Sequence, residues 1–168
     1  TSSPSIYTSH EIKALRSVCK YHDEVLNACV QMVLVNTNAY DRHSVFIALD
    51  ILHFILAEDP YEASPIDSSL VMDMLTSAIK HLMCSEDFQI LSKTLWFVFS
   101  IAPRFYSHHR NQLFLDILIT DNFFRLFGHW NFLVRKYFIF LLTFQIRRYG
   151  YQYDYKTALQ ITTNDLTS

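Results

Sequence analysis

Two cysteine–histidine pairs are the residues whose types and spacing come closest to those of a metal site. Cys19 and His22 are three positions apart, and so are His81 and Cys84. On a helix this spacing puts both side chains on one face, and four such ligands arranged as a tetrahedron can hold a zinc ion. Nothing in the sequence brings the two pairs together. We therefore expect no metal, and we interpret the cysteines as small core residues.

The usual residue patterns of enzymes are missing from the sequence. The chain has three cysteines and eight histidines, besides its serines, but it contains no nucleophile elbow and no HExxH helix. Its two glycines are too few to build a phosphate-binding loop. We expect a protein that is not an enzyme and that binds no cofactor.

Basic residues are concentrated late in the chain and are the candidates for binding a partner. Residues 1–99 carry 6 Lys or Arg against 12 Asp or Glu, whereas residues 100–150 carry 7 against 2. Such an asymmetry favours an acidic partner, or lets the two ends of the domain attract each other. A pI near 6.4 disfavours nucleic acid and leaves an anionic membrane surface as a further partner. The candidate residues are Arg104, His108, His109, Arg110, Arg147 and Arg148.

Composition predicts one all-α domain. Only two glycines and four prolines occur in 168 residues, and sheets need many more turns of the kind these residues make. Three cysteines do not make a disulfide framework, which favours a reducing compartment such as the cytoplasm. The longest uncharged apolar segment is about ten residues, too short to cross a membrane. The polar start without Met predicts a fragment of a longer protein.

Apolar residues recur every three or four positions, which predicts helices joined by short loops. Residues 1–8 are expected to be a polar extension, 9–150 the helical domain, and 151–168 a polar tail that packs on the last helix. A capping box between Thr8 and Glu11 begins the first helix, and a break is expected near His22. The expected helices are Thr8 to Asn36, Asp41 to before Pro60, Asp67 or Ser68 onward, Ser85 or Asp87 to before Pro103, Ser107 onward, Asp121 to Gly128, and Phe132 to near Gly150.

The last of these helices is expected to be the centre of the fold. Between Phe132 and Ile146, 11 of 15 residues are apolar or aromatic, and they lie on all sides of a helical wheel. This pattern is typical of a helix buried between layers. An apolar strip left over on it would contact further repeats, a second copy or another protein. A structural corner precedes the helix, with His129 and Trp130 as packing groups, so that Trp130→Ala should cost about 3 kcal/mol. Its residues are His129, Trp130, Val134 and Arg135.

Three segments of the chain can be aligned as an internal repeat. They start at Asp41, Asp87 and His129, which are 46 and 42 residues apart, and each has a polar opening followed by a long apolar helix. This is the period of HEAT and armadillo repeats, in which paired helices stack into a superhelix. We expect an alpha–alpha superhelix of about seven helices. Asn131 stands where HEAT repeats commonly have an Asp.

The segment from Asn111 to Arg148 resembles a family of unknown function from fungal and amoebal proteins with armadillo-like helical domains. The residues that carry the resemblance are Leu115, Leu118, Phe123, Leu126, Phe127, His129, Trp130, Val134, Arg135, Phe138, Leu141, Leu142 and Arg147. The resemblance implies a helical-repeat segment of a larger intracellular protein. The function we expect is a non-catalytic scaffold for another protein, for further repeats, or for a second copy through the C-terminal helix. The alternative is a basic-faced module for anionic lipid or RNA.

Overall fold

The computed structural model describes residues 10–57, 66, 68–114 and 122–149. All regular structure in those residues is helical, apart from an isolated bridge between Ile66 and Phe105. The elements are α1 (His10–Tyr21), α2 (Asp23–Val35), α3 (Arg42–Leu56), α4 (Ser69–Met83), α5 (Phe88–Ile101), the 3-10 turn η2 (Ala102–Arg104), α6 (Ser107–Gln112), α7 (Phe123–Phe127) and α8 (Phe132–Tyr149). The all-α class is confirmed. The Thr8 capping box, residues 1–8 and residues 151–168 lie outside the described residues.

The first predicted helix is divided into two at His22, as expected. The backbone of His22 is extended, at φ −135° and ψ 99°, so it cannot continue α1. Its carbonyl instead accepts the N–H groups of Val25 and Leu26, at 3.1 and 3.0 Å, and so begins α2. Asp23 and Glu24 occupy the first turn of α2, where the helix dipole favours negative charge. This division makes the described helices eight where about seven were expected.

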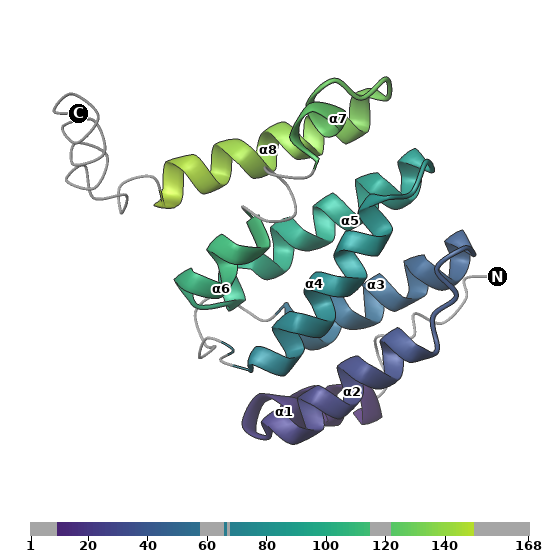
Figure 1. Ribbon diagram of the computed structural model, residues 1–168. Helices are drawn as coiled ribbons and strands as arrows, with labels where there is room; N and C mark the ends of the chain where they lie inside the picture. The colour runs from purple at the N-terminus through teal and green to yellow at the C-terminus, as the bar shows by residue number, and fades with distance from the viewer. Residues whose placement is uncertain (1–9, 58–65, 67, 115–121, 150–168) are drawn as a thin grey trace, which may run out of the picture.

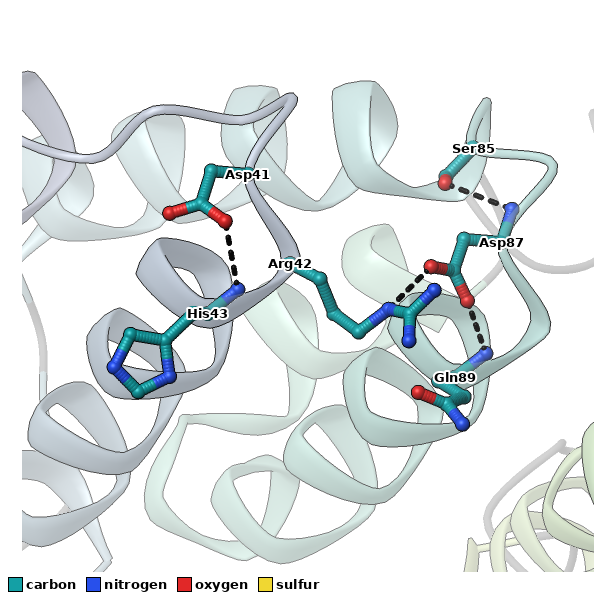
Figure 2. A network of polar contacts seen from close by, with 6 residues as sticks. All are labelled: Asp41, Arg42, His43, Ser85, Asp87 and Gln89. Atoms are coloured by element: carbon teal, nitrogen blue, oxygen red, sulfur yellow. Dashed lines mark hydrogen bonds and ion pairs between the residues drawn. The ribbon is translucent and has the colours of Figure 1, made fainter.

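Aspartate side chains cap α3 and α5, and Figure 2 shows both caps together. The Asp41 carboxylate accepts the N–H groups of His43 and Ser44, each at 3.1 Å. The Asp87 carboxylate accepts the N–H of Gln89 at 2.8 Å. Each carboxylate satisfies donors that the first turn of a helix leaves without a partner. The predicted starts of these two helices are confirmed.

An ion pair joins the first residue of α3 to the aspartate that caps α5. Arg42 Nε lies 2.6 Å from Asp87 Oδ2, so the first turn of α3 holds the start of α5. Burial raises the pKa of Asp87, but the hydrogen bonds from Gln89 and Arg42 together lower it by more, so the pKa lies below its usual value. A lowered folded-state pKa stabilises the fold above the unfolded-state pKa, and that stabilisation is lost as the pH falls through the folded-state pKa.

We expect Asp87→Ala to lower the free energy of unfolding at pH 7 by about 1 kcal/mol, the usual contribution of a cap. The difference from the parent should begin to shrink below about pH 4, where the unfolded-state carboxyl takes up a proton, and it should disappear as the pH falls through the lower folded-state pKa. Urea unfolding at pH 7 and pH 3 measures both effects. Arg42→Ala is the control, since it removes the ion pair and leaves the cap. A difference that stays constant with pH would contradict the role given to this carboxylate.

The helices form a row with a second set packed on it. In the row, α1 contacts α3, α3 contacts α5, and α5 contacts α8. Beside them α2 packs on α3 and α4, α4 packs on α5, and α7 packs on α8. Figure 1 shows α8 at one end of the molecule and α1 and α2 at the other. The three segments that begin at Asp41, Asp87 and His129 therefore contain α3, α5 and α8, which lie side by side.

The central helix is α5, and not α8 as the sequence indicates. Eight of the 14 residues of α5 are buried, and the helix contacts α3, α4 and α8. Two of them, Ser92 and Thr94, are polar. The Thr94 hydroxyl donates to the Ile90 carbonyl at 2.8 Å, whereas the buried Ser92 Oγ has no hydrogen-bond partner among the described residues. On α8 the buried side chains among those described are Val134, Phe138 and Leu141. The expectation that α8 is buried between layers was wrong, because α8 ends the described row and α5 lies on one side of it only.

Candidate functional site

The two cysteine–histidine pairs are not brought together as metal ligands. Cys19 on α1 instead faces Cys29 on α2, with 3.8 Å between the sulfur atoms, and both are buried. Across the part of the chain that the structure describes, no three His, Cys, Asp or Glu side chains are placed to hold a metal ion. Burial, together with the neighbouring Cys29 thiol, raises the pKa of Cys19 to about 12. Cys19 is therefore a protonated core thiol at neutral pH.

Thiol labelling should distinguish the three cysteines. Cys84 is exposed, whereas Cys19 and Cys29 are buried. Because the thiolate is the reactive form, we expect an aromatic disulfide reagent at pH 8 to label Cys84 quickly and the other two only as the protein unfolds. Absorbance of the released thiol measures the rates. Cys84→Ser should remove the fast phase, and a fast phase that survives this substitution would contradict the burial of the Cys19–Cys29 pair.

Arg104 and Arg110 were expected to present charge to a partner, and the structure corrects this. Arg104 is partly buried, and its Nε donates to the Leu56 carbonyl at 3.0 Å. Arg110 is 8% exposed, and its Nη1 donates to the Phe105 carbonyl at 3.4 Å. Backbone carbonyl groups at the ends of helices have no partner within the helix, and they accept hydrogen bonds from donors of this kind. These two guanidinium groups therefore hold the loop that joins α5 to α6.

The other predicted basic residues are divided between α6 and α8. His108 is exposed, with its ring 3.9 Å from that of His109 and 6.1 Å from that of Tyr106. The helix they begin is only six residues long, which makes a weak dipole. Arg147 and Arg148 belong to α8, but their side chains lie outside the described residues. Of the six candidate basic residues, the structure thus describes the side chains of the four that lie between Arg104 and Arg110.

The corner before α8 is closed by hydrogen bonds. Gly128 ends α7, and the N–H of Asn131 donates to His129 Nδ1 at 3.0 Å. The Asn131 side chain then accepts the N–H of Leu133 at 2.9 Å. From the next turn, Arg135 Nη1 donates to the carbonyls of His129 and Trp130, at 2.5 and 3.0 Å. Asn131 thus acts as a helix cap where an Asp is common, and Arg135 binds backbone rather than a carboxylate.

Trp130 is not the packing group that the sequence indicates. Its side chain is 72% exposed, although its ring stacks on His129 at 5.5 Å and meets the edge of Phe88 at 5.6 Å. Val134, four positions later, is fully buried. The corner exists as predicted, but its core is Val134 and its Trp130 ring lies on the surface.

Exposed apolar side chains gather on α7, the corner and α8. We call this set the α7–α8 face. Seven large apolar residues form it, and their exposed fractions run from 43% to 88%. Soluble proteins seldom expose so many large apolar side chains close together, so such a surface indicates a binding site. Its members are Phe124, Phe127, Trp130, Phe132, Leu133, Ile139 and Phe140.

The sequence of the segment that carries the α7–α8 face has basic residues and no acidic ones. From Asn122 to Tyr149 the sequence has five Lys or Arg and no Asp or Glu. Arg125 is exposed and donates to Asn122 Oδ1 at 3.0 Å. Lys136 extends over the Phe140 ring, with its Nζ 5.6 Å from the ring centre. Among the described side chains, these two cations thus lie beside the apolar surface.

A second candidate site is a groove between α2 and α4. It has a volume of about 720 Å³ and lies over buried side chains of α3 and over Phe97 of α5. The two helices are joined where Ser68 Oγ donates to Asn27 Oδ1 at 2.7 Å, and the groove is lined by the last part of α2 and by α4. Its walls are mainly apolar and include Leu34, Val35, Met74, Ala78 and Leu82. Periodicity could not predict it, because it arises only when α2 and α4 are set side by side.

Among the described residues His53 also has a shifted pKa, as Asp87 and Cys19 do, although it does not line the groove. Burial lowers its pKa, Asp50 opposes that change, and Arg16 and Lys93 reinforce it. The His53 ring lies 4.6 Å from the Trp96 ring. The imidazole is therefore neutral near pH 7 and serves in packing between α3 and α5.

The helices within the described residues include none with the length and apolar character needed to cross a membrane. Their arrangement offers two surfaces that could bind something, the α7–α8 face and the α2–α4 groove. Neither contains a set of residues typical of catalysis.

Comparison with known proteins identifies a family. No curated protein and no solved structure matches the chain significantly. A family model described as a protein of unknown function, DUF1765, matches residues 26–146. The match runs from α2 through most of α8, so it contains both candidate surfaces. Because it covers well over half of the 168 residues, the chain belongs to the DUF1765 family.

Proposed function

We propose that this chain is a non-catalytic helical scaffold in a larger cytoplasmic protein, and that it binds another protein or further repeats of the same parent. The architecture we propose is a HEAT- or armadillo-like stack. The spacing of 46 and 42 residues supports it, as does the contact of α3 with α5 and of α5 with α8. The pairs α2–α3, α4–α5 and α7–α8 would be the stacked units.

The observation that carries this proposal is the α2–α4 groove. Grooves between neighbouring helices accept the apolar face of a partner helix. Val35 on the wall of this groove is 76% exposed although it is a large apolar residue. Gln31, Asp73 and His81 add polar groups that could orient a bound segment. An apolar groove with a few polar groups is suited to binding the apolar face of a partner helix.

Co-purification with the full-length parent tests the proposal. Ala78→Glu puts a carboxylate into the groove wall at a partly exposed position, so the fold should tolerate it. We expect a partner protein that accompanies the parent to be lost from this variant. Gln89→Glu, which adds the same charge at an exposed position on α5 outside the groove, should retain it. If both variants recover the same proteins as the parent, the groove is not the binding site.

A further inference from the structure

The exposed residues of α8 occupy one side of that helix. At 100° per residue, positions 132, 133, 136, 139, 140 and 143 fall within about 120° of the circumference. Each of these is exposed except Lys136, which is half-buried. The buried residues Val134, Phe138 and Leu141 lie on the opposite side and belong to the core that α8 shares with α5. The α8 part of the α7–α8 face is therefore a continuous stripe that points away from the row of helices.

The short α7 and the corner add aromatic rings to this stripe. On α7, Leu126 is buried, whereas Phe124 and Phe127 are 88% and 53% exposed and lie one turn apart. Trp130 follows at the corner with 72% of its surface exposed. Aromatic residues, Trp among them, are enriched where proteins meet the headgroup region of a membrane, because their rings suit a boundary between apolar and wet surroundings.

We propose that the α7–α8 face is a peripheral membrane-binding surface that lies on bilayers containing anionic phospholipids. This site is separate from the α2–α4 groove and does not depend on the function proposed for it. The apolar side chains would enter the headgroup boundary, and Lys and Arg would meet the lipid phosphates. Binding of this kind combines buried apolar area with attraction to anionic lipid.

The charges favour lipid over a second copy of the chain. Five basic residues and no acidic ones lie between Asn122 and Tyr149. A two-fold contact through this face would set like charges against each other, which opposes association.

The position of Lys136 favours lipid over a protein partner. It lies near the middle of the apolar stripe, and Lys is depleted in the dry centre of protein interfaces. At a membrane the long Lys side chain can keep its apolar stem among the acyl chains while its ammonium reaches a phosphate.

Vesicle cosedimentation of the full chain tests the proposal. The probes are phosphatidylcholine vesicles with and without phosphatidylserine, at about 0.1 M and about 1 M salt, where the screening length falls from about 10 to about 3 Å. We expect binding to require phosphatidylserine and to weaken at the higher salt. Equal binding to both vesicles, or binding to neither, would overturn the proposal.

Matched variants locate the surface. Lys136→Glu should weaken binding about tenfold or more, since a repelling charge replaces an attracting one. Lys80→Glu, at an exposed position on α4, should not change it. Phe124→Ser should also weaken binding, whereas Tyr40→Ser should not, although these two residues are 88% and 91% exposed. Losses that do not differ between the members of each pair would contradict the assignment to this face.

Three further measurements test the contact with lipid and the two other candidate occupants. With Trp96→Phe as background, Trp130 is the one remaining tryptophan, and its emission should shift to the blue on phosphatidylserine vesicles. Sedimentation velocity without lipid reports a second copy, and a gel shift with single-stranded RNA reports nucleic acid. Self-association or an RNA shift that Phe124→Ser abolishes, in a protein that does not bind vesicles, would assign the α7–α8 face to that partner and overturn the proposal.

Discussion

Phe138→Ala should lower the free energy of unfolding by about 3–5 kcal/mol, the range for large aromatic truncations in cores. The Phe138 side chain is fully buried on the inner side of α8, and the edge-to-face ring of Phe123 lies 5.7 Å away. Removing it leaves a cavity in the core shared by α5, α7 and α8, which the surrounding helices can fill only partly. Urea denaturation followed by circular dichroism measures the change.

Trp130→Ala is the control for that experiment. The sequence indicates a cost of about 3 kcal/mol for this truncation, as for a core aromatic residue. In the structure Phe138, and not Trp130, is the buried aromatic residue for which such a loss of stability is expected. Trp130 is 72% exposed, so its truncation removes few buried contacts. We expect about 1 kcal/mol or less, as for most surface positions. Equal losses in the free energy of unfolding for the two truncations would mean that Phe138 is not buried between α8 and α5.

Phe97→Ala should have an effect of similar size, about 3–5 kcal/mol. Phe97 is 1% exposed, lies on the central helix α5 and contributes to the base of the α2–α4 groove. Truncation of the Phe97 side chain therefore removes contacts between α5 and the helices packed on it. The same denaturation measures it, and the midpoint should fall with little change in slope.

The adjacent residue Trp96 is the matched control. It is larger than Phe97 but 37% exposed, and its ring lies against His53 at 4.6 Å. We expect Trp96→Ala to cost clearly less than Phe97→Ala, since less of its surface is transferred from water on folding. The reverse order would mean that α5 is rotated relative to the row of helices.

The two proposed surfaces lie at different places along the row. The groove lies between α2 and α4. The α7–α8 face lies at the end of the molecule that α8 occupies in Figure 1. A protein partner in the groove would therefore not block lipid at α8. The groove and vesicle experiments can fail independently, because Ala78→Glu and Lys136→Glu change separate sites.

The sequence by itself determined the class of the fold and most helix ends. Asp41 was expected at a helix start, and Ser68 and Asp87 were each one of two candidates there; all three accept a backbone N–H in the first turn. Gly128 ends α7 as predicted, and a Cβ at that position would come within 3.1 Å of the Phe124 carbonyl. These features are predictable because a cap or a helix end depends on hydrogen bonds among neighbours in the chain.

Only the tertiary structure decided which apolar residues are covered. The apolar pattern of α8 predicts that it is the buried centre, yet α5 is the central helix, because among the described elements α5 contacts α3, α4 and α8, whereas α8 contacts α5 and the short α7. Trp130 is exposed and Arg110 is buried, both against expectation. Periodicity tells which residues share a face of a helix. It does not tell which distant helix covers that face, and burial, the groove and the α7–α8 face all depend on that contact.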